Sequence, residues 1–324
     1  MSPQTSQAAA LTEQDFSVAD SLAEILEGLS RTQKSLSPKF FYDAHGSKLF
    51  DDICELPEYY LTRTELAIMR AHIDDIAALV GPQASLIEFG SGSSLKTRIL
   101  LDGLDRLAAY VPVDISREHL MTAAESLAAD YPDIEVWPVL ADFMQSFKLP
   151  NPSVMPLRNI VYFPGSTIGN FSPEKAHSLL TVMHEEAGED GALLIGVDLQ
   201  KDIAVIERAY NDSAGVTAEF NLNVLTRINT EFGANFDVDL FRHHAVYHEE
   251  HGRIEMYLIS ECEQIVRIDG RSFSFRKGEM ILTEHSHKYT LEQFGKIANR
   301  AGFAVDTVWT DPEELFSVQY CRRV

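Results

Sequence analysis

Residues 85–96 read Ser-Leu-Ile-Glu-Phe-Gly-Ser-Gly-Ser-Ser-Leu-Lys, and this stretch decides the fold. A short apolar run ends in two closely spaced glycines, Gly90 and Gly92, and a helical pattern begins at Lys96. Glycine lets the chain turn tightly and lets the backbone approach a ligand without a clash from a Cβ atom. The stretch therefore predicts a strand, a ligand-binding turn and a helix.

Predicted strands and helices alternate around this turn. The strands cover 85–89, 109–113, 134–140, 159–163 and 192–197, and the helices cover 62–80, 96–107, 117–130 and 173–187. Such alternation predicts an α/β domain with a parallel, doubly wound sheet. A helix at 290–301 and two strands at 304–310 and 316–322 would complete the sheet.

The length of 324 residues suits two domains, because a domain averages about 150 residues. Residues 201–230 have a helical pattern, and 236–248, 253–266 and 271–275 fit antiparallel strands that interrupt the α/β pattern. We expect a disordered tail at 1–15 and a sheet domain at 64–200 plus 288–324. A second, inserted α+β domain would comprise 16–63, with an aromatic-rich loop at 39–47, plus 201–287.

Composition excludes several classes of partner. Lys and Arg total 27 against 49 Asp and Glu, a net charge of −22, and no basic stripe is present to bind nucleic acid. No apolar run approaches the ~20 residues of a membrane-spanning helix, and residues 1–20 lack signal-peptide features. The three cysteines are widely spaced, and the histidines at 243–251 lack the spacing of a metal site. We therefore expect a cytoplasmic protein without a metal, nucleic-acid or membrane partner.

Three consecutive predicted strands end in Gly90, Asp114 and Asp142. Ligands of open α/β sheets bind outside the carboxyl ends of the strands. Asp114 can accept hydrogen bonds from ribose hydroxyls, Asp142 can accept one from an adenine amino group, and Phe143 can pack on the adenine ring. A dinucleotide motif needs a third glycine where Leu95 stands, and an acidic residue before the first glycine, here Glu88, is typical of class I methyltransferases, so S-adenosylmethionine is favoured over NAD(P).

The fourth predicted strand ends in Phe163-Pro-Gly-Ser-Thr-Ile-Gly-Asn-Phe171, which we call the acceptor loop. The Asn170 amide is both donor and acceptor, which suits an amine or a carboxylate of a substrate. The alternative is that Asn170 caps the helix that starts near Pro173.

The sequence resembles the histidine-specific, S-adenosylmethionine-dependent methyltransferases of ergothioneine biosynthesis. The resemblance spans about residues 38–290 and rests on Phe41-Tyr-Asp43, Leu49-Phe-Asp51, Leu56-Pro-Glu-Tyr-Tyr60, Thr62-Arg-Thr-Glu65, the glycine turn, the acceptor loop, Ile254-Glu-Met256 and Thr283-Glu-His-Ser286. It implies a class I methyltransferase domain with a Rossmann-like sheet, and a separate substrate-binding domain.

The resemblance also implies the site residues. The cofactor site would be lined by Tyr42, Gly90, Lys96, Asp114, Asp142 and Phe143. The amino-acid pocket would be lined by Phe50, Tyr59, Asn170, Tyr210, Met256, Glu284 and Ser286. Asn170 and Tyr210 would hold the reacting amine, and Tyr60 is the fallback for Tyr59. His285 departs from the family pattern, in which we expect a small apolar residue.

Glu284 and Ser286 are two residues apart on a predicted strand, so both side chains face one side. A carboxylate and a hydroxyl can satisfy the two imidazole nitrogens. The resemblance thus implies an enzyme that trimethylates the α-amino group of L-histidine, and we expect it to be a monomer. The alternatives are an α-N-methyltransferase for another amino acid such as a tryptophan derivative, an NAD(P)-dependent oxidoreductase, and a non-catalytic cofactor-binding protein. Glu284 argues against an indole, which cannot satisfy a buried charge so well.

Overall fold

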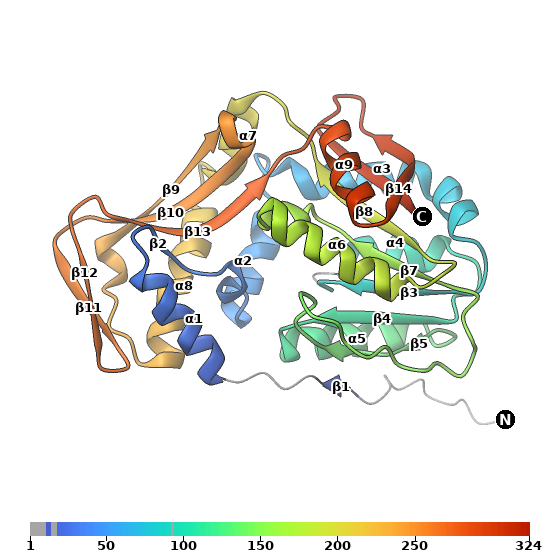
Figure 1. Ribbon diagram of the computed structural model, residues 1–324, viewed down its shortest axis with the longest axis horizontal. Coiled ribbons are helices and arrows are strands. Elements are labelled where there is room, and N and C mark those ends of the chain that lie inside the picture. Colours follow the sequence, from blue (N-terminus) through green and yellow to red (C-terminus); the bar gives the residue numbers. More distant parts are fainter. Residues whose placement is uncertain (1–10, 14–17, 92–93) are drawn as a thin grey trace. The chain divides into compact units, whose positions relative to one another are not determined.

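The computed structural model describes residues 11–13, 18–91 and 94–324, and the chain divides into two compact units (Figure 1). The first unit comprises 1–14, 61–200 and 288–324, and the second comprises 15–60 and 201–287. The sequence predicts domain boundaries after residues 63, 200 and 287. In the structure the chain passes from one unit to the other after Tyr60, Gln200 and His287. Most of the predicted disordered tail, and Gly92 of the glycine turn, lie outside the described residues.

The described strands of the first unit form one sheet in the order β1-β6-β4-β3-β7-β8-β15-β14, with β5 paired to β4. Their bounds are β1 Thr12–Glu13, β3 Ala84–Phe89, β4 Ala109–Asp114, β5 Glu135–Val136, β6 Val139–Leu140, β7 Arg158–Phe163, β8 Ala192–Asp198, β14 Phe303–Thr310 and β15 Phe316–Arg323. All pairings are parallel except those of β15 with β8 and β14. This arrangement confirms the predicted α/β sheet, which the antiparallel strands predicted at 304–310 and 316–322 complete.

The helices of the first unit are α3 Tyr60–Val80, which starts in the second unit, α4 Leu95–Gly103, α5 Arg117–Asp130, α6 Pro173–Ala187 and α9 Leu291–Arg300. Helix α6 begins where Pro173 and the capping side chain of Ser172, which accepts from Lys175 N, favour a first turn. The capping box formed by Thr290 and Gln293 starts α9 in the same way. No helix in the described part of the chain is both long and apolar enough to cross a membrane.

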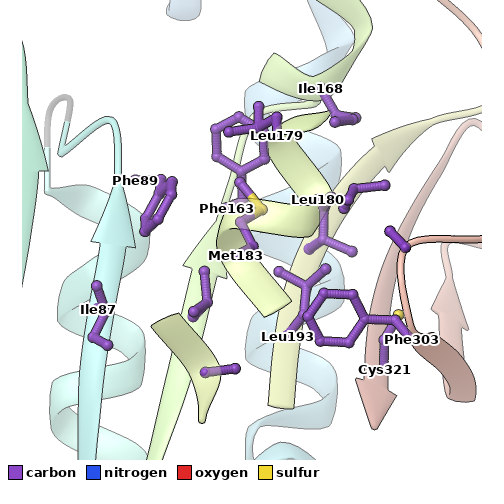
Figure 2. Close-up of a cluster of buried hydrophobic side chains, with 14 of the residues drawn as sticks. Ile87, Phe89, Phe163, Ile168, Leu179, Leu180, Met183, Leu193, Phe303 and Cys321 are labelled. Carbon is purple, nitrogen blue, oxygen red and sulfur yellow. The ribbon is translucent and has the colours of Figure 1, made fainter. Parts of the chain in front are cut away.

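The core of the first unit lies between the sheet and helices α6 and α9. Figure 2 shows Phe89 of β3 and Phe163 of β7 facing Leu179 and Met183 of α6. Because side chains alternate along a strand, Glu88 points to the opposite face of the sheet from Phe89. Burial of each such side chain stabilises the fold by roughly 1.5–3 kcal/mol, so the core fixes the strands whose ends carry the predicted site.

The second unit is a four-stranded sheet in the order β2-β13-β10-β9, with a separate β11-β12 hairpin. The strands are β2 Lys34–Ser35, β9 Phe241–His248, β10 Arg253–Ser260, β11 Gln264–Ile268, β12 Arg271–Phe275 and β13 Met280–His287. The helices are α1 Val18–Ser30, α2 Ala44–Cys54, α7 Ile203–Tyr210 and α8 Val216–Phe232, and α7 and α8 both contact β9 and β10. The unit is therefore α+β.

The structure differs from the predicted elements in several places: the predicted strand 253–266 is two strands, β10 and β11, and the predicted helical stretch 201–230 is two helices, α7 and α8. The loop predicted at 39–47 is instead the 3₁₀ helix Pro38–Phe41 and the start of α2, where Asp43 caps the helix by accepting from Gly46 N at 2.7 Å. The strand predicted at 134–140 splits at Pro138, which has no N–H to donate to the sheet. Thr12–Glu13, predicted to be disordered, forms strand β1 beside β6.

Candidate active site

The glycine turn of the first unit joins β3 to α4. Gly90 has φ of +80°, which favours glycine, and its N–H donates to Val113 O at 2.8 Å. The hydroxyls of Ser91 and Ser94 are buried, and neither has a hydrogen-bond partner within the described ranges. Buried polar groups are nearly always satisfied, so these hydroxyls fit a turn that receives a polar ligand.

The two predicted aspartates lie at the ends of neighbouring strands. Asp114 ends β4 and its Oδ1 accepts from Ser116 N at 2.8 Å, while Asp142 follows β6 and its Oδ1 accepts from Met144 N at 3.0 Å. Burial raises the pKa of Asp114, against the hydrogen bond from Ser116 that lowers it. Ribose hydroxyls donating to this carboxylate would offset part of its desolvation.

Phe143 packs its ring on Phe89 and Phe163, with centroid distances of 5.6 and 5.9 Å. The ring is partly buried against the core of the first unit. Its predicted contact with adenine stays a prediction, as does the predicted contact of Tyr42 with the cofactor, since Tyr42 belongs to the second unit.

Asp114→Ala is expected to weaken binding of S-adenosylmethionine or its demethylated product by ~1–3 kcal/mol, because charge-assisted ribose hydrogen bonds are lost. Isothermal titration calorimetry measures the effect. Asp133→Ala, which removes an exposed carboxylate from the same unit, is the matched control. An Asp114→Ala variant with wild-type affinity would remove Asp114 from the cofactor site.

Glu88 lies directly before the glycine turn but its carboxylate is buried. It accepts hydrogen bonds from Thr97 Oγ1 at 2.7 Å and from the Tyr110 hydroxyl at 2.6 Å. Burial raises the pKa of Glu88 to about 7, although the hydrogen bonds from Tyr110 and Thr97 lower it. Through these hydrogen bonds Glu88 of β3 links the strand to β4 and α4, next to the glycine turn.

The raised pKa of Glu88 predicts a pH-dependent stability. The folded pKa of about 7 exceeds the ordinary 4.5, so between these values the folded state binds more protons than the unfolded state. The free energy of unfolding should therefore be highest below this window and should fall as pH rises through it. Glu88→Gln keeps an acceptor without the charge and should flatten the profile. Urea unfolding of both proteins from about pH 5 to pH 8 tests this. A Glu88→Gln variant whose free energy of unfolding falls with pH as steeply as that of wild type would refute the prediction.

The acceptor loop turns sharply after β7, with φ of +76° at Gly165 and +57° at Ser166. Asp198 N donates to Ser166 Oγ at 2.9 Å, which ties the loop to the end of β8. Asn170 ends the 3₁₀ helix Thr167–Asn170 and is half-buried. The alternative that Asn170 caps α6 is wrong, because Ser172 is the cap.

The second unit contains a small cavity with aromatic walls. Tyr42, Phe50, Tyr59 and Tyr210 form an edge-to-face series whose successive ring centroids are 5.7, 6.4 and 6.2 Å apart. Burial, more than the nearby Tyr210, raises the pKa of Tyr59 well above its usual range, so Tyr59 is a neutral phenol. The full lining is Tyr42, Phe50, Ile53, Tyr59, Ala209, Tyr210, Thr217, Phe220, Met256 and Glu284.

A polar group interrupts the aromatic wall on strands β10 and β13. Met256 is paired in register with Glu284, and both line the cavity. Ser286, two residues further on the same face of β13, accepts a hydrogen bond of 2.8 Å from the Tyr210 hydroxyl. His243 supports this arrangement, because its Nε2 lies 2.8 Å from Tyr210 O.

The cavity brings together five of the seven predicted pocket residues, and Ser286 is bonded to one of them. Asn170 belongs to the first unit. Tyr60 is absent from the lining, and its hydroxyl accepts from Lys201 Nζ at 2.7 Å. His285 points away from the cavity, with Nε2 3.6 Å from the Glu255 carboxylate. Burial lowers the pKa of His285 to about 4, so this departure from the family pattern adds no charge to the pocket.

Four lining residues are not predicted from the sequence: Ile53, Ala209, Thr217 and Phe220. Phe220 contacts three aromatic residues, with ring centroids 4.6 Å from Phe41, 5.8 Å from Tyr42 and 6.0 Å from Phe50. The helical spacing of Thr217, Phe220 and Val224 predicts that they share a buried face of α8. It does not predict that this face borders a cavity.

The chain matches the family described as histidine-specific, SAM-dependent methyltransferase over residues 21–323. Histidine N-alpha-methyltransferase of Mycolicibacterium smegmatis is 41% identical over 95% of this chain and 98% of that protein. Ergothioneine biosynthesis protein 1 of Neurospora crassa is 30% identical over 86% of this chain, which spans 32% of that longer protein. L-tryptophan methyltransferase of Psilocybe serbica is 28% identical over 92% of this chain and 90% of that protein.

These matches confirm the predicted family and the predicted use of S-adenosylmethionine, and they exclude the NAD(P)-dependent alternative. The family match covers all the described strands of the sheet except β1, together with the glycine turn, the acceptor loop and the aromatic cavity. The chain therefore belongs to the histidine-specific, S-adenosylmethionine-dependent methyltransferases.

Proposed function

We propose that the protein transfers methyl groups from S-adenosylmethionine to the α-amino nitrogen of L-histidine until the nitrogen carries three, as the first step of ergothioneine biosynthesis. The choice of histidine as the amino acid rests on two polar side chains of strand β13, those of Glu284 and Ser286. Glu284 lines an otherwise aromatic and aliphatic wall, and Ser286 lies on the same face of β13. An imidazole presents one N–H donor and one acceptor, which match a carboxylate and a hydroxyl.

The proposal distinguishes histidine from an indole side chain. An indole has one N–H and no acceptor nitrogen, so it could engage the Glu284 carboxylate or the Ser286 hydroxyl but not both. A pocket that is built to hydrogen-bond a polar ring discriminates strongly against analogues that leave its polar groups unpaired. The relative that is named for tryptophan shows that the fold alone does not select the amino acid.

The residues of this chain need to position the amine and accommodate the charge that accumulates on it. S-adenosylmethionine supplies an electrophilic methyl group when bound. We assign Asn170 and Tyr210 to hold the neutral amine by hydrogen bonds while water takes its proton. The rings of Phe50, Tyr59 and Tyr210 would favour the growing quaternary ammonium by cation–π attraction.

A time course with free histidine tests the proposal. Liquid chromatography with mass spectrometry follows the amino acid, and the demethylated cofactor is quantified in the same samples. We expect three equivalents of demethylated cofactor per histidine and a final product whose fragments place every methyl group on the α-nitrogen. A reaction that stops after one methyl group, or that methylates the ring, would contradict the proposal.

We propose that the enzyme acts as a monomer in the cytoplasm, and the three cysteines are unbridged thiols, as suits a reducing compartment. Size-exclusion chromatography with light scattering tests the monomer, and a dimer at the assay concentration would overturn it.

A further inference from the structure

Glu65 of α3 belongs to the Thr62-Arg-Thr-Glu65 motif, to which the proposed reaction gives no role. Its carboxylate is completely buried in the first unit. Burying a carboxylate costs several kcal/mol unless it is paired and hydrogen-bonded, so a residue of this kind is held by specific partners. The partners of Glu65 are Lys96, at the start of the helix that follows the glycine turn, and Gly165 of the acceptor loop.

The first partner is Lys96, the predicted cofactor residue at the start of α4. Its Nζ lies 2.5 Å from Glu65 Oε2, and the lysine side chain is 16% exposed. The attraction between these charges is therefore only weakly screened by solvent. The pair fixes the direction in which the Lys96 side chain leaves the glycine turn.

The second partner is the acceptor loop. The N–H of Gly165 donates to Glu65 Oε2 at 2.9 Å and to Oε1 at 3.1 Å. Gly165 starts the left-handed turn that leads to Asn170, so this bond holds the loop at its first bend. A Cβ atom at Gly165 would lie 3.4 Å from Lys96 Nζ, which shows how closely the two loops approach at Glu65.

The sheet leaves room for this carboxylate at Gly196 of β8. A Cβ atom at position 196 would lie 2.1 Å from Glu65 Oε1, so any larger residue would displace the carboxylate. A glycine in the interior of a strand weakens the strand, and it often marks a close approach. Because residue 196 has no side chain, the Glu65 carboxylate occupies the space beside β8 that a side chain there would fill.

We propose that Glu65 is a positioning residue that couples the cofactor turn to the acceptor loop, through Lys96 on one side and Gly165 on the other. In this role it acts through Lys96 and Gly165 and not by contact with either substrate. Its effect on turnover rests on the proposed function, whereas its effect on cofactor binding does not. Small displacements of reacting groups lower rates steeply, so loss of this coupling should reduce turnover in an enzyme that is still folded.

Glu65→Gln tests the Lys96 side of the coupling. The amide keeps an oxygen that accepts from Gly165 N, but it removes the charge that holds Lys96. We expect kcat at saturating substrates to fall by about 10-fold to 100-fold. We also expect affinity for the demethylated cofactor, measured by calorimetry, to fall on the order of tenfold, the size of one charge-assisted bond. Asp74→Asn, an exposed charge removal on the same helix, is the control and should match wild type.

A double-mutant cycle with Lys96→Met distinguishes positioning from a structural role. If Glu65 acts through Lys96, Glu65→Gln should have little further effect on cofactor affinity in the Lys96→Met background, whereas Glu65→Ala should still lower kcat because Gly165 loses its acceptor. Equal effects of Glu65→Gln in both backgrounds would overturn the coupling. So would a Glu65→Gln enzyme with a lower melting temperature but wild-type kcat and affinity.

The two proposals fail separately. If wild type binds the cofactor but does not methylate histidine, the proposed function is wrong, and the calorimetric cycle still decides the role of Glu65. If wild type trimethylates histidine and Glu65→Gln equals it in kcat and affinity, the role of Glu65 is wrong and the function stands.

Discussion

Replacing Glu284 by alanine is expected to lower kcat/KM for histidine on the order of 100-fold, which corresponds to the loss of one charge-assisted hydrogen bond of ~3 kcal/mol. Glu284 is 9% exposed and lines a cavity whose other walls are mainly aromatic and aliphatic. Nothing in that lining replaces a carboxylate acceptor for the imidazole N–H. The expected loss is therefore in binding of the ring, with a smaller effect on catalysis at saturation.

The same substitution should raise the low activity with tryptophan, because a buried charge no longer opposes the indole. Met256 faces Glu284 in register across β10 and β13, so Met256→Val enlarges the cavity at the same place. The double variant should show the largest gain with tryptophan. Glu250→Ala, an exposed carboxylate of the same unit, is the control. A histidine-to-tryptophan ratio of kcat/KM that Glu284→Ala leaves unchanged would remove the main physical support for histidine.

Replacing Lys288 by methionine is expected to destabilise the protein by about 3–5 kcal/mol, because it leaves a buried charge without its partner. Lys288 Nζ lies 2.7 Å from Asp198 Oδ2, and both side chains are completely buried. Asp198 also donates its N–H to Ser166 of the acceptor loop. The ion pair therefore lies in the first unit at the end of β8, where Asp198 is also hydrogen-bonded to the acceptor loop.

Chemical denaturation measures this effect as the change in the free energy of unfolding. Lys296→Met, which removes a lysine from an exposed pair with Glu292, should leave stability nearly unchanged. Lys288→Met combined with Asp198→Asn should recover part of the loss, because the unpaired charge is also removed. A single Lys288→Met variant as stable as the Lys296→Met control would show that the buried pair contributes nothing net.

Local patterns in the sequence predicted most of the described strands and helices of the first unit, but not strand β1 or the split at Pro138. The apolar run before Gly90, the aspartates after β4 and β6, and the Ser172-Pro173 start of α6 each depend on residues that are close in sequence. Such signals determine strand ends, turns and helix caps directly. These signals predicted a parallel sheet with the cofactor residues at the carboxyl ends of its strands, whereas the strand order comes from the structure.

Features that depend on distant residues could not be predicted in this way. The first turn of α2 falls in the loop predicted at 39–47, because Asp43 and Gly46 are residue types common in turns, whereas here Asp43 caps a helix. Phe220 lines the cavity because α8 packs on β9 and β10, which periodicity on α8 does not reveal. The Glu65–Lys96 and Asp198–Lys288 pairs join residues 31 or more positions apart, and neither has a local signature.

The most direct test of the account is competition among amino acids in one reaction. The enzyme is given S-adenosylmethionine with a labelled methyl group and an equimolar mixture of the proteinogenic amino acids, and mass spectrometry identifies every labelled product. The account predicts that histidine is consumed first and that its product carries three labelled methyl groups on the α-nitrogen. Label that appears first on tryptophan or on another amino acid would contradict the account.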